Sequence, residues 1–356
     1  MVAIPMEHPR PVSDRRAGAR RLTGMLAATL VTAAALSLEL GPTDVRLSGV
    51  LDSLASGQAL SRLERVVMVD IRLPRTVLAM LVGAALAVSG AVMQGLFRNP
   101  LADPGIVGVG AGAGLGAVTA IVLGGLAPAG LAALAGPWLV PLAAFVGAWG
   151  ATLLLYRVAT RAGRTSVATM LLAGIALGAL AGAVSGILIF RADDAQLRDL
   201  TFWSLGSLAG ATWGKVLVAG PMIALAALAA PLLSRGLNAL ALGEAPAHHL
   251  GIDVQALKNR AVLLVAVATG AAVAVSGGIG FVGIVVPHLL RMSGGPDHGR
   301  LLPNAALAGA ALLLLADLAS RTVVAPAELP IGIVTALLGT PVFLWILLRS
   351  RGVVDL

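Results

Sequence analysis

The chain has 356 residues, of which 58% are hydrophobic and only 12% are charged, with 44 glycines, no cysteine and a formal net charge of +8. A soluble globular domain carries about 25% charged residues, so this composition, with a mean hydropathy of +0.94, indicates a membrane protein. The lack of cysteine excludes disulfides and thiolate metal sites. No polar stretch is long enough for a large soluble domain, and we expect residues 1–356 to form one transmembrane domain.

Apolar runs recur from one end of the chain to the other. About 20 helical residues cross the ~30 Å hydrocarbon core of a bilayer, and the sequence predicts ten such spans, at residues 22–40, 76–97, 105–126, 136–156, 166–189, 213–233, 261–276, 279–293, 303–319 and 330–348. The basic stretch RRAGARR before the first span is also typical of a signal peptide. No convincing small-residue cleavage site follows Leu38, so we expect a retained helix after a cytoplasmic tail of residues 1–21.

Basic residues are distributed unequally between the two sides of the predicted membrane domain. With the N-terminus inside, the cytoplasmic segments hold 16 of the 25 lysines and arginines. The positive-inside bias therefore predicts an even number of spans and two cytoplasmic termini. Three arginines are exceptions, because they fall at the predicted outer face: Arg72, Arg75 and Arg321.

Two nucleotide-binding patterns can be tested against the sequence. The stretch GIVGVGAGAGLG at residues 105–116 formally matches the dinucleotide fingerprint at Gly108, Gly110 and Ala113, but that fingerprint needs a strand in a βαβ unit. Glycines four residues apart instead favour close helix packing in lipid, and the pairs are Gly110/Gly114 and Gly112/Gly116. No P-loop motif occurs, so if ATP drives transport, another subunit hydrolyses it.

The segment LGEAPAHHLGI, residues 242–252, is unusually polar for this chain. An acid at its start, two histidines at its end and a following glycine fit the dipole and C-cap preferences of a short helix. His248 and His249 make a poor metal site, because adjacent helical residues point ~100° apart and the H-E-x-x-H spacing is absent. The segment, in the long predicted cytoplasmic loop 234–260, is therefore a solvated loop or a helix that docks into a partner through Ala247 and Leu250.

Four blocks of the sequence resemble the permease subunits of ABC importers for iron-siderophores, heme and cobalamin. They are RLPRTVLAMLVGAALAVSGAVMQGLFRNPLADPGIVGVGAGAG (72–114), LGEAPAHHLGID (242–253), GGIGFVGIVVPHLLRMSGGPDHGRLLPNAALAGAALLLLADLASR (277–321) and ELPIGIVTALLGTPVFLWILLRSRG (328–352). The resemblance covers nearly the whole chain from about Arg72 onward. It implies an all-α polytopic membrane protein with about ten transmembrane helices, in the type II ABC importer architecture. Such a subunit is not an enzyme, and it holds no catalytic residue, cofactor or metal.

The resemblance also implies partners in a bacterial inner membrane. They are a second copy of the chain, two cytoplasmic ATPase subunits that bind ATP and Mg, and one periplasmic binding protein; no nucleic acid is implied. The residues that match the ATPase coupling helix are Glu244, Ala247, Leu250 and Gly251. The outer residues Arg72, Arg75 and Arg321 match the family's docking arginines for the binding protein, and their ordinary alternative is snorkelling at the membrane interface.

Residues 190–213, FRADDAQLRDLTFWSLGSLAGATW, resemble the heme-importing branch of the family. The likeness rests on a W-x-x-G-S-L pattern that begins at Trp203, in a segment without histidine, tyrosine or cysteine to ligate iron. Heme carries two propionates, which a guanidinium can bind bidentately, so we expect Arg198 first and Arg191 second to contact heme at the outer mouth of the path. For Arg198 the alternative is an ion pair with Asp194 or Asp199, and for the substrate it is a ferric siderophore or cobalamin.

Few polar residues lie inside the predicted spans. Met93 and Gln94 either line the substrate path or pack between helices. His288 follows Pro287, where a polar side chain commonly satisfies freed backbone groups, and we do not expect it to bind heme. A secondary transporter would show buried acids, whereas only Asp317 comes close to this. A membrane enzyme would need clustered acids, bases or metal ligands, and the scattered histidines of this chain do not supply them.

Overall fold

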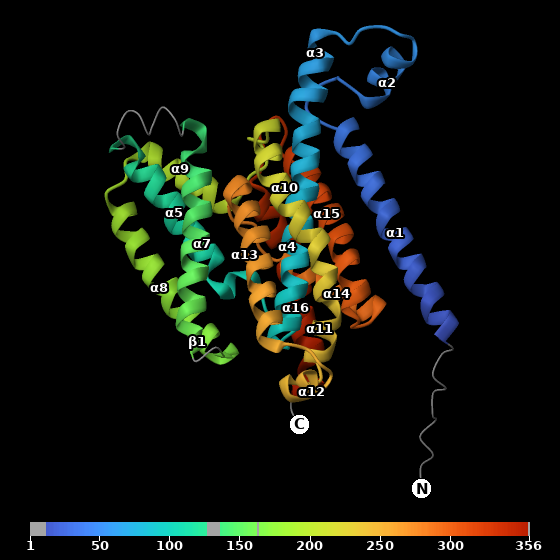
Figure 1. The fold of residues 1–356 in the computed structure, drawn as a ribbon. Helices are drawn as coiled ribbons and strands as arrows, with labels where there is room; N and C mark the ends of the chain where they lie inside the picture. The colour runs from blue at the N-terminus through green and yellow to red at the C-terminus, as the bar shows by residue number, and fades with distance from the viewer. Residues whose placement is uncertain (1–11, 127–135, 162–163, 355–356) are drawn as a thin grey trace.

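The computed structural model describes residues 12–126, 136–161 and 164–354, and the regular secondary structure in this part of the chain is helical apart from one short hairpin (Figure 1). Within it, nine helices are long and apolar enough to cross a membrane, and the shorter apolar α14 joins them. The prediction of about ten transmembrane helices is confirmed. They are α1 (Val12–Glu39), α4 (Leu73–Phe97), α5 (Val109–Leu123), α7 (Leu139–Ala159), α8 (Val167–Phe190), α10 (Trp213–Ala229), α13 (Val254–Ser276), α14 (Val282–Gly294), α15 (His298–Thr322) and α16 (Ile331–Val354).

Shorter elements lie at the two ends of the bundle (Figure 1). The end at the top of Figure 1, called the α3 end below, carries α2 (Leu47–Ala55), α3 (Arg62–Arg65) and α9 (Asp194–Leu205). The opposite end, called the α12 end, carries the antiparallel strands β1 (Thr160–Arg161) and β2 (Arg164–Thr165), and also α11 (Ser234–Leu240) and α12 (Glu244–His249). The described residues also form short π and 3-10 turns: η1 (Val66–Arg72), η2 (Pro104–Val107), η3 (Gly124–Leu126), η4 (Gly136–Trp138) and η5 (Ala230–Leu233).

The second span begins earlier than its apolar run. The Ser61 hydroxyl accepts a hydrogen bond from the Glu64 N–H at 3.2 Å, and the Glu64 carboxylate accepts one from the Ser61 N–H at 2.8 Å. This capping box starts α3, which continues through the π-helical η1 into α4. The predicted start at residue 76 is therefore too late. The predicted loop 234–260 and tail 1–21 are likewise partly helical, because α13 begins at Val254 and α1 at Val12.

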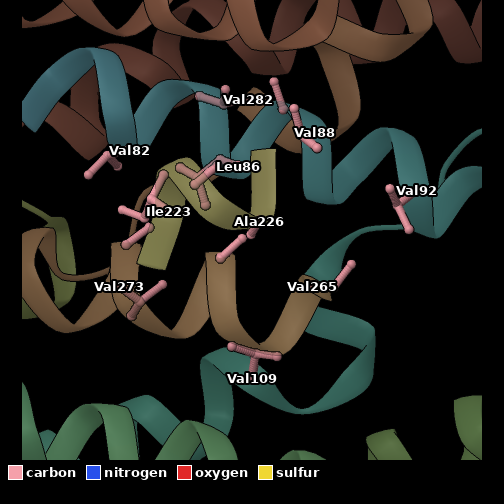
Figure 2. Close-up of a cluster of buried hydrophobic side chains, with 14 of the residues drawn as sticks. Val82, Leu86, Val88, Val92, Val109, Ile223, Ala226, Val265, Val273 and Val282 are labelled. Carbon is pink, nitrogen blue, oxygen red and sulfur yellow. The ribbon is translucent and has the colours of Figure 1, made fainter. Parts of the chain in front are cut away.

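Helix α4 forms the centre of the bundle, where it packs against α10, α13, α14 and α15. Figure 2 shows part of this buried apolar core, with Val82 and Leu86 of α4 beside Ile223 of α10 and Val273 of α13. Glycine allows the closest helix approach in this core. A Cβ atom added to Gly83 would collide with a backbone carbonyl of α15, so the two helices touch through their backbones, as small residues permit in membrane proteins.

A second group of helices, α5, α7 and α8, lies beside this centre, with α13 between the two (Figure 1). Gly112 and Gly116 of α5 meet the backbone of α7 so closely that neither could carry a Cβ atom. Gly110 and Gly114 face open space. The predicted close packing is therefore confirmed for one glycine pair and wrong for the other.

Candidate functional site

Two buried arginines share one carboxylate at the α3 end. Arg75 of α4 donates to both carboxylate oxygens of Asp317 of α15, at 2.9 to 3.1 Å, and to Glu328 at 2.9 Å. Arg321 lies 3.7 Å from the same Asp317 carboxylate and donates to the Ser37 carbonyl of α1 at 2.7 Å. Asp317 is 1% exposed. A buried charge requires partners of this kind, because leaving water is costly, and the cluster therefore fixes α1, α4 and α15 to one another.

Arg72, one turn before Arg75, has a different set of partners. Its guanidinium donates to the Leu38 carbonyl at 2.5 Å, to the Val45 carbonyl at 2.8 Å and to the Thr43 hydroxyl at 3.0 Å. The last carbonyl groups of a helix have no partner within that helix. Arg72 therefore donates hydrogen bonds to a carbonyl at the end of α1 and to the chain that follows it.

The three arginines that were expected to dock a binding protein are buried in this conformation. Arg72, Arg75 and Arg321 are 3%, 6% and 4% exposed, so they neither snorkel nor present their charge to a partner. Their hydrogen bonds within the chain account for the burial. Docking through Arg72, Arg75 and Arg321 stays a prediction, and for Arg75 and Arg321 it requires a partner's carboxylates to replace those of Asp317 and Glu328.

Helix α12 contains most of the segment that was expected to couple to an ATPase. Ala247 is completely buried, whereas Leu250 at the helix end is 57% exposed. Ala247 therefore packs inside the chain and cannot enter a partner's groove, which corrects half of that expectation. Gly251 follows with a φ of +78°, and Ile252 donates to the Ala247 carbonyl at 3.1 Å, so the helix ends at an αL glycine as predicted.

Glu244, the first residue of α12, is paired with a lysine that sequence reasoning missed. Lys258 of α13 is 4% exposed and donates to the Glu244 carboxylate at 2.8 Å and to the Thr165 carbonyl of β2 at 2.9 Å. The available signal was a lysine in the first turns of an apolar helix. Among the described residues, no group of three histidine, cysteine or acidic side chains is placed to hold a metal ion.

Arg198 lies on α9 at the α3 end, as expected for a residue at one mouth of the domain (Figure 1). Asp193 and Gln196 cap the start of α9 through a reciprocal pair of hydrogen bonds. Arg191 and Arg198 are both exposed, and neither takes part in an ion pair within the described part of the chain. The alternative in which Arg198 pairs with Asp194 or Asp199 is therefore absent from this conformation.

The W-x-x-G-S-L pattern after α9 is a junction between three segments. The Trp203 carbonyl accepts from the Gly206 N–H at 3.1 Å, Ser207 donates to the Ser276 carbonyl at 2.8 Å, and Ile331 donates to the Gly206 carbonyl at 3.2 Å. Gly206 has a φ of +72°, a conformation that few other residues adopt. This geometry explains the pattern by backbone packing of the end of α9 against the end of α13 and the start of α16, and not by contact with a particular substrate.

Two apolar hollows border the end of α9. One has a volume of about 690 Å³ and lies between Ser204, Phe281 and the first turns of α16. The other, of about 390 Å³, lies between α5, α8 and α9, beside Gly114, Gly182 and Thr201. Arg198 precedes Thr201 by three residues on α9, and residues three apart are neighbours on a helix surface. Arg198 itself lines neither hollow.

Met93 and Gln94 lie on α4, and Gln94 faces α14. Met93 is completely buried, and the Gln94 amide donates to the Gly283 and Ile284 carbonyls at 3.3 Å and accepts a hydrogen bond from Arg291. This geometry matches the packing interpretation of both residues. Gln94 also borders a hollow of about 560 Å³ at the α12 end.

The remaining polar groups near α14 are His288 and Asp103. His288 Nδ1 has no hydrogen-bond partner among the described residues. The hydrogen bond to a backbone group that was expected of this side chain is therefore not formed by Nδ1. Asp103, in the loop between α4 and α5, accepts from the Gly105 N–H at 2.8 Å. Burial raises the pKa of the Asp103 carboxyl, and this hydrogen bond opposes the rise.

The profile of the FecCD transport family matches residues 29–349. This chain belongs to the FecCD transport family. It is a multi-pass permease subunit without an enzymatic role, and permeases of this family form ABC importers with an ATPase and a binding protein.

Individual relatives of this FecCD permease are bacterial, which implies a bacterial inner membrane. The hemin transport system permease protein HmuU of Yersinia pestis is 50% identical over 285 residues, which are 80% of this chain and 84% of that protein. The vitamin B12 import system permease protein BtuC of Salmonella arizonae is 44% identical over 83% of this chain and 87% of its own length. A solved inward-facing metal-chelate type ABC transporter superposes with a TM-score of 0.81 at 32% identity, covering 93% of this chain and 99% of that one.

Proposed function

We propose that this FecCD permease moves heme across the inner membrane by alternating access, as the membrane subunit of an ATP-driven importer. The observation that supports the proposal most is the 50% identity to a hemin permease. Vitamin B12 permeases reach 44–46% identity over a similar share of the chain, so cobalamin is the second candidate. A ferric siderophore follows, because the similar solved transporter is of the metal-chelate type.

The hollows beside α9 support heme on chemical grounds. A porphyrin needs apolar walls, which the hollow of about 390 Å³ between α5, α8 and α9 provides beside Thr201. Its two propionates need cationic donors, and Arg198 is exposed and has no ion pair within the described residues. A guanidinium binds a carboxylate through two parallel hydrogen bonds. Arg198 is therefore our first contact for a propionate, with Arg191 second; Met93 and Gln94 contribute only if the helices separate.

The exposed face of α8 supports a homodimer. Within this span only Met170 and Ala181 are buried. Gly178, Gly182 and Gly186 are spaced four apart, and each has open space where a Cβ atom would lie. Such small-residue stripes allow a second membrane helix to approach closely. We infer that a second copy of the chain packs against this face of α8.

The α12 end is our proposed docking site for the two ATPase subunits. Leu250 is the exposed apolar side chain of that segment, and Glu244 is half exposed beside it. In this assignment both termini and the coupling segment 234–260 are cytoplasmic, residues 1–356 act as one domain, and ATP and Mg bind only to the partner. Residues 1–11 of the proposed tail lie outside the described residues. The α3 end then faces the periplasmic binding protein.

Uptake into proteoliposomes tests the substrate assignment. Vesicles would contain the permease with its ATPase and a binding protein, and would be offered heme, cobalamin and a ferric siderophore in parallel. We expect ATP-dependent heme uptake that falls in an Arg198→Ala variant, with the exposed Arg62→Ala of the same end as the matched control. Transport of cobalamin or a siderophore without heme would overturn the heme assignment and leave the family assignment intact.

A further inference from the structure

Lys258 connects two elements that are distant in sequence. Its ammonium group bridges the Glu244 carboxylate of α12 and the Thr165 carbonyl of β2, at 2.8 and 2.9 Å. Figure 1 shows α12 and β1 at the same end of the molecule. A buried ammonium is stable only when its N–H groups have acceptors, so neither acceptor can move away freely while the other stays in place.

The β1–β2 hairpin is held by a second side chain of the same helix. Gln255 accepts from the Thr165 N–H at 2.9 Å and donates to the Thr165 hydroxyl at 2.6 Å. The same amide donates to the Asn259 side chain at 2.8 Å, which also accepts from the Tyr156 hydroxyl of α7 at 2.5 Å. All the hydrogen-bonding groups of Thr165, backbone and side chain, are thus in contact with side chains of α13 or with its own hairpin.

The hairpin leads directly into α8. Thr165 is followed by Ser166, whose hydroxyl caps α8 by accepting from the Thr169 N–H at 3.2 Å. Within one chain, helix α8 has few buried residues, whereas α4 is buried along most of its length. A displacement of Thr165 is therefore transmitted to the start of the span that we propose to contact the second copy.

We propose that Lys258 is a positioning residue that links α12 to the β1–β2 hairpin, so that movement of the ATPase at α12 moves the start of α8. The proposal rests on the proposed docking of the ATPase at α12. The side chain of Glu244 is 49% exposed and that of Lys258 only 5%. A partner can therefore reach the outer member of the pair, and the inner member carries the change to the hairpin.

Movement of the hairpin is the first measurement, because it needs no transported substrate. The chain has no cysteine, so Arg161→Cys, on the exposed part of β1, places a single spin label on each hairpin. Distances between labels in the permease–ATPase complex would be compared without nucleotide and with trapped ATP. We expect a shift in the otherwise native chain and in a Lys215→Met control, which replaces the other lysine of the sequence. Lys258→Met should abolish the shift, and an unchanged shift in Lys258→Met would overturn the proposal.

Coupled transport is the second measurement. In proteoliposomes with heme as the probe, Lys258→Met should lower the uptake per ATP hydrolysed at least about fivefold, the lower range of coupling between linked sites. Lys258→Arg, which keeps the charge and the donors, should restore part of the coupling. A purely structural role would lower thermal stability, ATP hydrolysis and uptake together and leave the uptake per ATP hydrolysed unchanged. That outcome would overturn the proposal. If Lys258→Met does not fold, Glu244→Ala removes the same contact from the half-exposed side and is read by the same criteria.

A separate variant distinguishes failure of this link from failure of ATPase docking. Leu250→Glu places a charge on the exposed side of the proposed docking helix and should prevent co-purification of the ATPase. If the ATPase still binds to that variant, docking at α12 is wrong and the link falls with it. If docking is lost in Leu250→Glu, yet Lys258→Met retains the hairpin shift, only the link is wrong.

Discussion

The two ends of the bundle contain basic residues in opposite arrangements. At the α3 end, the side chains of Arg75 and Asp317 are 7% and 1% exposed, so both members of the pair are sealed from solvent. At the α12 end, the side chain of Lys258 is 5% exposed and that of its partner Glu244 is 49% exposed. A partner protein can reach Glu244 without opening the bundle. At the α3 end, it must first separate Arg75 from Asp317.

This difference indicates which end can respond to a partner and which end holds the fold. A buried charge pair is costly to break from one side, because the remaining charge stays buried without compensation. Breaking a pair with one exposed member costs less stability, since water replaces the missing partner. The α3 end should therefore dominate stability, and the α12 end should dominate coupling.

Asp317→Asn is the substitution with the largest expected effect on stability. Asp317 compensates Arg75 and lies 3.7 Å from Arg321, and all three are buried. Breaking a buried pair from one side costs about 3–5 kcal/mol, and we expect a loss of that size in the unfolding of the purified permease in mixed micelles. Asp194→Asn, an exposed aspartate of the same end, is the control and should change stability by less than about 0.5 kcal/mol. Equal losses of stability in the two variants would contradict the conclusion that the buried charges of the α3 end hold the fold.

Arg72→Met should have the next largest effect. The change removes a charged donor from the Leu38 and Val45 carbonyls, and hydrogen bonds to charged groups contribute about 1.5–3 kcal/mol. We expect a loss in this range, with faster amide hydrogen exchange confined to the segment from the end of α1 to α2. Arg46→Met, at an exposed arginine nearby, should leave exchange in that segment unchanged. Uniformly faster exchange throughout the bundle would contradict a local role for Arg72.

The sequence predicts the fold well where apolar length is the signal. Each of the ten apolar runs lies on a helix, because a bilayer demands about 20 apolar residues from any helix that crosses it. The errors lie at the ends, as in the capping box at Ser61 that starts the second span before its apolar run. Hydropathy cannot locate such ends, since polar caps determine them.

The candidate site is predicted less well, because its contacts join residues far apart in sequence. Arg75 and Asp317 are 242 residues apart, and nothing near Arg75 indicates that its charge is satisfied inside the chain. The same limitation applies to Ala247 and Leu250, which both fit a docking face in the sequence although only Leu250 is exposed. Periodicity defines the faces of a helix, but only packing shows which face the chain itself covers.

Glu244→Gln sharpens the comparison at the α12 end. The amide keeps an oxygen acceptor for Lys258 and removes the negative charge from a side chain that is 49% exposed. Because solvent screens such a pair, we expect a loss of at most about 1 kcal/mol, measured in the same unfolding experiment. A loss near that of Asp317→Asn would mean that the α12 end also holds the fold, and that its ion pair is not a contact open to a partner.

Glu328→Gln should have the smallest effect, although it removes a carboxylate from the same arginine that Asp317 holds. The side chain of Glu328 is 34% exposed, and Arg75 keeps its three hydrogen bonds to Asp317. We expect a loss of about 0–1 kcal/mol that shrinks further as salt is added, because partly exposed charges are screened. The Asp317→Asn loss should persist in high salt, since ions do not reach that pair. The contrary result is a loss of stability in Glu328→Gln that is as large as that of Asp317→Asn and does not depend on salt. It would show that burial of the carboxylate does not decide how strongly a pair stabilises the chain. The contrast between the two ends would then fail.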